Sequence, residues 1–212
     1  EREAAALIEK NFGFEGRRNY LGEGIGPRLG GCSIGGDAGT YYPVMWKNIV
    51  EKHSVKTVID IGCGFGWAAK WFHDNGCKTV GVEGLKHAVD ESPVSDLLVL
   101  HDYETDGPFI PDQEFDLAWC CEFVEHVDEL FADNFIRTFK SAKLLAMTYA
   151  FPGQGGHHHV NEQHAEYWIE ALEKAGFKYD TDLTNLFRDW AKLDELEWNK
   201  IESATERETK YK

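Results

Sequence analysis

Short apolar runs alternate with stretches of helical spacing through the middle of the chain. Each run is nearly continuous in its apolar side chains, which is typical of strands covered on both faces. Strands that alternate with helices predict a mostly parallel sheet with helices on both sides. We expect strands at residues 57–61, 79–83, 96–100, 115–121 and 143–149, and helices at residues 41–53, 67–75, 87–92, 130–140 and 164–175.

The two ends of the chain have weaker patterns. Residues 1–12 predict a short helix, because alanine, leucine and isoleucine follow one another among charged residues. Residues 13–39 are irregular and rich in glycine, so we interpret them as a loop or lid. Residues 177–187 predict one or two final strands, and the charged tail from Leu193 onward is expected to be helical or frayed.

Length and composition fit one domain, since the chain has 212 residues of which 42% are hydrophobic and 28% charged. No apolar run is long enough to cross a bilayer, so we expect a cytoplasmic protein without a membrane partner. The expected organisation is an N-terminal helix and lid at residues 1–40, an α/β domain at 41–190 and a charged tail at 191–212. The chain opens at Glu1 rather than Met, which is consistent with a domain cut from a longer polypeptide.

Charge and cysteine usage exclude some classes of partner. The formal net charge of -15 repels phosphate backbones, so we expect no nucleic-acid partner. The only basic cluster is a weak one, at Arg17, Arg18 and Arg28. The five cysteines include no CxxC pair, which favours reduced, buried thiols over a zinc or redox site.

The unusual polar residues follow the predicted strands. In a parallel sheet the ligand sits beyond the carboxyl ends of the strands. This places five segments on one rim, namely Asp60 to Gly66, Glu83, Asp102, Cys121 to Glu125, and residues 151–159.

A glycine-rich loop opens the first helix after a strand. Gly62, Gly64 and Gly66 allow a tight turn and a close approach of a ligand to the backbone. Glu83 ends the next strand, and its two carboxylate oxygens can accept both hydroxyls of a ribose. Together these residues predict a nucleoside-containing cofactor.

Residues 58–66, with the sequence VIDIGCGFG, resemble motif I of class I S-adenosylmethionine-dependent methyltransferases. Residues 115–127, FDLAWCCEFVEHV, resemble the fourth motif of the same family, and the likeness is greatest to its ubiquinone-biosynthesis-like group. Nicotinamide enzymes usually show GxGxxG without an acid directly before it, so Asp60 fits them badly. The resemblance covers roughly residues 40–177. It implies a Rossmann-like, doubly wound sheet of seven mostly parallel strands, the last antiparallel, and S-adenosylmethionine as cofactor.

The resemblance also implies roles for single residues. Asp60 and the glycine loop would hold the methionine portion of the cofactor, and Glu83 would hold the ribose. Asp102 would accept from the adenine amino group, although a turn or capping aspartate is the alternative. The cofactor candidates are Asp60, Gly62, Cys63, Gly64, Gly66, Glu83, Gly84, Asp102, Tyr103, Cys121 and Tyr41.

Histidines supply the candidates for catalysis. An alcohol has a pKa comparable to that of water, ~15.7, so its methylation needs a general base or a metal. His157, His158 and His159 follow the fifth predicted strand; if extended, His157 and His159 share one face. His126 and Glu122 complete the catalytic candidates. The alternatives are a capping cluster, or a divalent ion on His157, His159 and a carboxylate such as Glu125 or Asp128, which we do not expect.

The acceptor is the least determined feature of the sequence. Seven tryptophans and eight tyrosines are many for this length; most are expected in the core, and a few on the rim would suit a sugar. We therefore predict O-methylation of a sugar or glycan hydroxyl, with a small phenol, quinone precursor or amine as the alternative. A NAD-dependent oxidoreductase and a silent cofactor-binding domain are less favoured.

Overall fold

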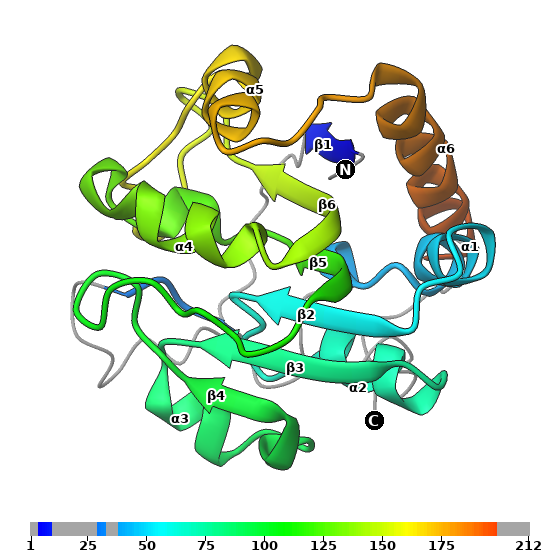
Figure 1. The fold of residues 1–212 in the computed structure, drawn as a ribbon, viewed down its shortest axis with the longest axis horizontal. Coiled ribbons are helices and arrows are strands. Elements are labelled where there is room, and N and C mark those ends of the chain that lie inside the picture. The colour runs from blue at the N-terminus through cyan, green and yellow to red at the C-terminus, as the bar shows by residue number, and fades with distance from the viewer. Residues whose placement is uncertain (1–3, 10–28, 33–37, 199–212) are drawn as a thin grey trace.

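The computed structural model describes residues 4–9, 29–32 and 38–198, and these build one sheet with helices on both faces (Figure 1). The sheet has six strands in the order β1-β6-β5-β2-β3-β4. Every pair of neighbouring strands is parallel. The strands are β1 (Ala4–Glu9), β2 (Thr57–Ile61), β3 (Lys78–Glu83), β4 (Leu98–Leu100), β5 (Phe115–Cys120) and β6 (Ala142–Tyr149).

The helices form a layer on each side of the sheet, as the alternation of elements predicts. On one face α1 (Pro43–Lys52), α2 (Trp67–Asp74) and α6 (Thr181–Trp198) share a core cluster with the sheet. On the other face α4 (Ala132–Phe139) and α5 (Ala165–Lys174) do so. The short helix α3 (Lys86–Asp90) lies beside β3 and β4. Single turns of 3-10 helix occupy Ala38–Thr40, Ser95–Leu97, Val124–His126 and Glu129–Phe131.

Adjacent side chains of each strand pack against opposite helical layers, and both layers are apolar. This explains the continuous apolar runs in the sequence. Val58 packs in the cluster with α1, whereas Ile59 packs in the cluster with α4. In the same way, Leu117 packs in the cluster with α1 and Ala118 packs in the cluster with α4. The expectation for the tryptophans is confirmed at four positions, since Trp46, Trp119, Trp168 and Trp190 are buried.

The topology defines where a ligand can bind. From β2 the chain builds outward through β3 to β4, then crosses to the other side of β2 and builds β5 and β6. The direction of winding therefore switches between β2 and β5. Ligands of such sheets bind at the carboxyl ends of the strands at this switch point.

The seven-stranded sheet with an antiparallel last strand is wrong for the described residues, and so is the N-terminal helix. Residues 4–9 form β1, which pairs in parallel with β6 from Ala4↔Leu144 to Glu9↔Tyr149. Helix propensity is a weak preference even for alanine, which has the highest, and tertiary context overrides it here because the outer edge of β6 offers a full row of backbone partners. Residues 1–3 and 10–12 of the predicted helix lie outside the described residues.

The final strands predicted at residues 177–187 are also wrong, because α6 begins at Thr181. The Asp180 carboxylate accepts a hydrogen bond from the Leu183 amide at 2.9 Å, as a helix cap does. Leu183, Phe187 and Trp190 then recur at helical spacing and pack in the core. The helix runs across the expected domain boundary at residue 191, and residues 199–212 of the tail lie outside the described residues.

Two expectations from composition can be compared with the structure. All five cysteines are free thiols, of which Cys77 and Cys120 are buried. No helix within the described ranges is long and apolar enough to cross a membrane. Most of the glycine-rich segment 13–39, with Arg17, Arg18 and Arg28, lies outside the described residues.

The buried carboxylate of Asp194 joins α6 to the start of α1. It accepts hydrogen bonds from the amides of Val44 at 2.8 Å and Met45 at 3.0 Å. Asp194→Ala leaves these helix-terminal amides without this partner, so we expect the free energy of unfolding to fall by about 1–3 kcal/mol.

Urea denaturation measures this loss, and Asp189→Ala is the matched control. Asp189 lies on the same helix but is exposed and pairs only with Lys192, so its removal should change stability by less than about 0.5 kcal/mol. Equal effects of the two substitutions would contradict the capping role of Asp194.

Candidate functional site

The loop between β2 and α2 requires its glycines. Gly62, Gly64 and Gly66 have φ of +69°, +54° and +75°, a region that other residues rarely adopt. A Cβ on Gly62 would lie 2.2 Å from the ring of Phe123, which follows β5. The loop therefore packs directly against the residues that follow β5, at the switch point.

The carboxylate of Glu83 connects this loop to the end of β3. One oxygen accepts from the Gly64 amide at 2.7 Å, and the other accepts from the Leu85 amide at 2.8 Å. Burial raises the pKa of Glu83, and the backbone hydrogen bonds partly offset this rise. A carboxylate has about four acceptor sites, so Glu83 can still accept a ligand hydroxyl beside these backbone bonds.

Asp60 lies under the loop rather than on it. Its side chain is 2% exposed, and it accepts a hydrogen bond from the Ala69 amide in the first turn of α2 at 3.0 Å. Burial raises the pKa of Asp60 to about 7. The carboxylate therefore supports the start of α2, and its contact with the methionine portion of the cofactor stays a prediction.

The end of β4 lies beside the end of β3, as expected. A Cβ on Gly84 would be 3.7 Å from the Cα of Asp102. The Asp102 carboxylate accepts from the Glu104 amide at 2.9 Å, so it acts as a turn aspartate in the structure. Tyr103 is 3% exposed and packs edge-on against Phe123, so a contact with a cofactor would use its main chain.

The remaining cofactor candidates lie in different places. Cys63 is half-buried in the glycine loop, and burial raises the pKa of its thiol. Cys121 is half-buried after β5, where its sulfur lies 3.7 Å from the hydroxyl oxygen of Thr148. Tyr41 packs against Trp46, with ring centroids 4.9 Å apart, in the cluster under α1.

Residues 29–32, which belong to the expected lid, lie against both the glycine loop and His126. A Cβ on Gly64 would lie 3.2 Å from the Cβ of Cys32. A Cβ on Gly30 would lie 2.6 Å from the His126 ring. The glycine loop and His126 therefore both lie against the same short segment. His126 and the neighbouring histidines 157–159 are called the histidine cluster below.

Glu122 occupies a strained position at the end of β5. Its φ is +52°, in the left-handed region that costs a residue with a side chain of order 1–3 kcal/mol. The buried hydroxyl of Thr148 on β6 accepts from the Glu122 amide at 2.7 Å and donates to its carboxylate at 2.8 Å. Thr148 thus orients a carboxylate at the switch point, a role that no local sequence signal indicates.

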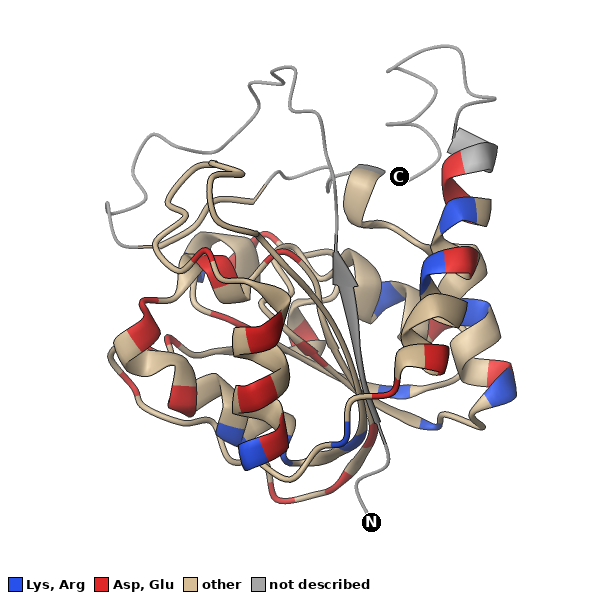
Figure 2. Ribbon diagram, turned by 90° about the horizontal axis from the view of Figure 1, so that it is seen from above, with Lys and Arg blue, Asp and Glu red and all other residues tan. Residues whose placement is uncertain are grey.

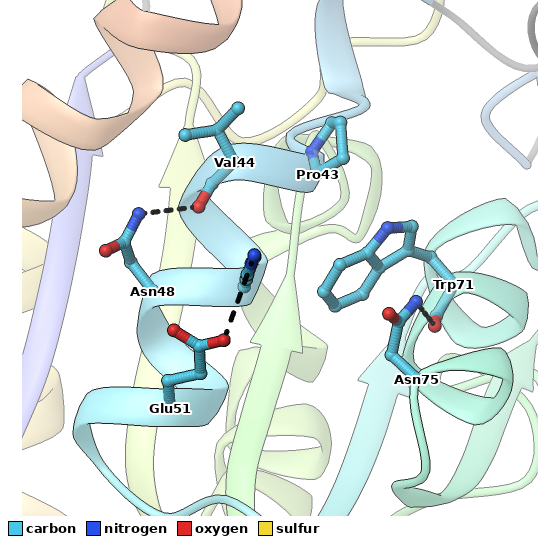
Figure 3. Close-up of a pocket in the computed structure, with 7 residues that line it drawn as sticks. Pro43, Val44, Asn48, Glu51, Trp71 and Asn75 are labelled. Carbon is cyan, nitrogen blue, oxygen red and sulfur yellow. Dashed lines mark hydrogen bonds and ion pairs between the residues drawn. The ribbon is translucent and has the colours of Figure 1, made fainter.

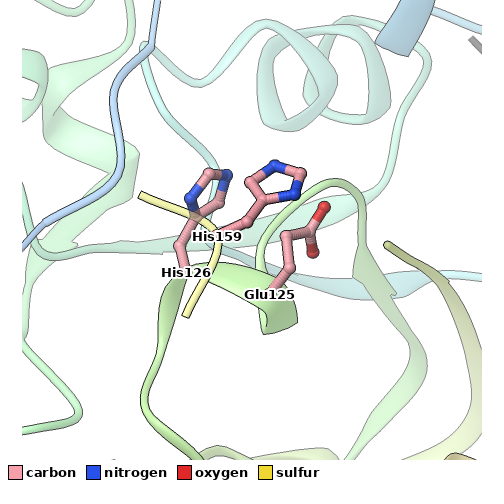
Figure 4. A group of neighbouring side chains, drawn as sticks. All are labelled: Glu125, His126 and His159. Atoms are coloured by element: carbon pink, nitrogen blue, oxygen red, sulfur yellow. The ribbon is translucent and has the colours of Figure 1, made fainter. Parts of the chain in front are cut away.

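His126 and His159 meet across the loop that follows β6 (Figure 4). Their ring centroids are 5.0 Å apart and nearly perpendicular. The Nδ1 of His126 lies 3.2 Å from the carbonyl oxygen of His158. Burial, followed by the proximity of His159, lowers the pKa of His126 to about 4, so this imidazole is neutral at physiological pH.

The expected extended arrangement of the three histidines is wrong. His157 is exposed, His158 lies in a turn with a φ of +54°, and Gly155 before them also has a positive φ, so this segment is not extended. His159 instead holds the Glu162 carboxylate, at 3.2 Å from its Nδ1. Sequence analysis missed Glu162, which faces His159 only because the chain turns back on itself here.

A hollow on the flank of the molecule lies between α1 and α2, apart from the strand ends (Figure 3). It is lined by Pro43, Val44, Lys47, Asn48, Glu51, Trp71 and Asn75. None of the expected site residues lines this hollow, so it is not the candidate site.

Acidic residues are spread over both helical layers, and basic residues lie among them (Figure 2). Several lysines pair with acidic neighbours one helical turn away, such as Lys86 with Asp90 and Lys174 with Glu170. The absence of a nucleic-acid partner stays a prediction.

Asp60 should make stability depend on pH. Between about pH 4 and pH 7 the folded chain keeps a proton on Asp60 that the unfolded chain has lost, so stability falls as the pH rises through this range. Asp60→Asn removes this contribution. We therefore expect urea denaturation to show a smaller fall in the free energy of unfolding across this range in the variant; the same fall in both proteins would contradict the raised pKa.

Comparison with known proteins agrees with this geometry. A family model described as a methyltransferase domain matches residues 59–145, which run from Ile59 in β2 to Leu145 in β6. A search of curated proteins found no match.

Three solved structures illustrate the likeness. The YcgJ protein from Bacillus subtilis is 17% identical with a TM-score of 0.50, covering 79% of this chain and 81% of its own. An S-adenosylmethionine-dependent methyltransferase from Mesorhizobium loti is 16% identical with a TM-score of 0.49, covering 68% and 83%. One from Archaeoglobus fulgidus is 20% identical with a TM-score of 0.46, covering 64% and 69%.

At these identities the structural likeness concerns the fold, and the family match concerns the segment that carries the glycine loop, Glu83 and the end of β5. Residues 59–145 of the chain thus match the methyltransferase-domain family, and they lie in an α/β fold with a parallel sheet.

Proposed function

We propose that this chain is an S-adenosylmethionine-dependent methyltransferase that methylates a hydroxyl oxygen of a sugar or glycan, and that a histidine takes the hydroxyl proton. An O–C bond forms as the S–C bond of the sulfonium breaks, and the proton moves to an imidazole nitrogen. The enzyme's main tasks are to align the two reactants and to exclude water.

The contact of residues 29–32 with both the glycine loop and His126 carries this proposal. It puts the histidine cluster next to the cofactor loop, on the edge of the sheet where the methyl group would be presented. A proton acceptor at this place is needed for a hydroxyl acceptor, whereas an amine only has to arrive uncharged.

Among the histidines, His158 is our candidate for the general base. The pKa of His126, about 4, makes it a weak proton acceptor, and His157 is exposed. His158 is half-buried, and its strained backbone is held by the hydrogen-bond contact of its carbonyl with His126. Strain of this kind is often retained at functional sites.

The polarity of the rim favours a polyhydroxylated acceptor. Besides the histidines it carries Glu122, Glu162 and Gln163, each half-buried. Most of the tryptophans are in the core, and a phenol or quinone precursor would require a more apolar pocket. The net charge of -15 favours a small-molecule or glycan acceptor over a nucleic acid.

We place the cofactor at the same edge of the sheet, beyond the carboxyl ends of the strands. We propose that Glu83 binds the ribose hydroxyls, that the loop at Gly62, Gly64 and Gly66 holds the methionine portion, and that Asp102 lies at the adenine. The support is that Glu83 is already oriented by two backbone amides.

Glu83→Ala should therefore weaken S-adenosylmethionine binding at least ~10-fold, since charge-assisted hydrogen bonds to both ribose hydroxyls are lost. Lys86→Ala is the control, because Lys86 is exposed on α3 and pairs with Asp90. Isothermal titration calorimetry measures both. Equal effects of the two substitutions would remove Glu83 from the ribose role.

The acceptor class is tested by methyl transfer to a panel of free sugars, glycosides, small phenols and amines, read out as S-adenosylhomocysteine. We expect turnover on a glycoside, and His158→Ala should lower kcat by about 10²–10⁴-fold without changing cofactor affinity. His73→Ala, an exposed histidine on α2, is the control. Turnover on phenols or amines alone, with cofactor binding intact, would discard the sugar acceptor.

A further inference from the structure

We propose that Glu125, His126 and His159 bind one divalent transition-metal ion at the edge of the acceptor site. One carboxylate oxygen and one nitrogen from each imidazole lie within 4.8 Å of one another (Figure 4). A metal about 2.1 Å from each ligand sets neighbouring ligand atoms about 3.0–3.4 Å apart. Small side-chain rotations would therefore close the three groups around an ion.

The backbone holds the ligands together although they are far apart in the sequence. The carbonyl oxygen of Glu125 accepts from the amides of Val160 at 2.9 Å and Asn161 at 3.1 Å. These two bonds dock the segment that follows His159 onto the turn that carries Glu125 and His126. The cluster thus belongs to a constrained part of the structure and not to a chance meeting of surface side chains.

Oxygen atoms of neighbouring residues hold both imidazoles in place. The Nδ1 of His159 faces the Glu162 carboxylate, and the Nδ1 of His126 faces a backbone carbonyl, each at 3.2 Å. An oxygen acceptor at Nδ1 requires the proton there and leaves the lone pair on Nε2. A carboxylate or carbonyl behind each histidine is the common outer support of a metal site.

The burial of Glu125 is consistent with a cation. Its side chain has no solvent exposure, although a carboxylate is costly to place in the interior. Two imidazoles and one carboxylate suit zinc, iron, cobalt or manganese better than calcium or magnesium, which prefer oxygen ligands.

Three protein ligands leave coordination positions for water or a substrate oxygen. Because Gly30 lies against His126 and Cys32 against Gly64, these positions border the cofactor loop. An acceptor hydroxyl on the ion would lose its proton more easily, and His158 would receive that proton. This role rests on the proposed function, whereas metal binding itself does not.

The test is a titration of the full chain, freed of any tag and stripped of metal by a chelator, with Co²⁺ and Zn²⁺. We expect one ion per chain by calorimetry with Zn²⁺, and visible ligand-field absorption with Co²⁺. His159→Ala and His126→Ala should each weaken binding at least ~100-fold, and Glu162→Gln by about 10–100-fold. His73→Ala, which removes an exposed histidine on α2, should bind as wild type does.

Thermal unfolding checks that each variant is folded before its binding is interpreted. The number of ions bound by the wild-type chain tests the site without any variant. Failure of wild type to bind either ion, or wild-type affinity in both His126→Ala and His159→Ala, would overturn the metal site. Since no acceptor or cofactor is present in the titration, a failure of the sugar panel would leave its result unchanged.

Discussion

The two hydrogen bonds from backbone amides to the Glu83 carboxylate are the constraint around which the site is organised. They tie a loop that can form only with glycine to the end of the neighbouring strand, and so set the distance between the two. Asp60 supports the same loop from below through the first turn of α2. Because these contacts exist before any ligand arrives, the proposed ribose ligand would meet acceptors whose orientation is already set, and little ordering would be left for the binding step.

The central part of the fold could be predicted because its signals are local. Each of the strands β2, β3, β5 and β6 is buried on both faces, which produces an apolar run that a single sequence displays. The edges could not be predicted in this way. Residues 4–9 have the composition of a helix and become a strand because β6 offers an unpaired edge, a fact about tertiary structure. At the other end the apolar spacing after Asp180 was compatible with a helix, and its capping aspartate was the overlooked signal.

The candidate site also has one part that local sequence signals predict and one part that they do not. The glycine loop and Glu83 follow strands, so topology alone places them together. The histidine cluster depends on the path of an irregular loop. Two turns at Gly155 and His158 bring His159 to His126, while His157 remains exposed. Alternation along an extended chain could not predict this, and neither Glu162 nor Thr148 belongs to a recognisable motif.

The pairing of β1 with β6 has a consequence for the order of events during synthesis. Residues 4–9 are synthesised before residues 142–149, which form the strand edge that they occupy. Until that edge exists, an apolar segment near the start of the chain has no partner and must wait while the interior strands assemble. The sheet is therefore closed by contacts of very high sequence separation, and slow or interrupted translation would expose β1 for longest.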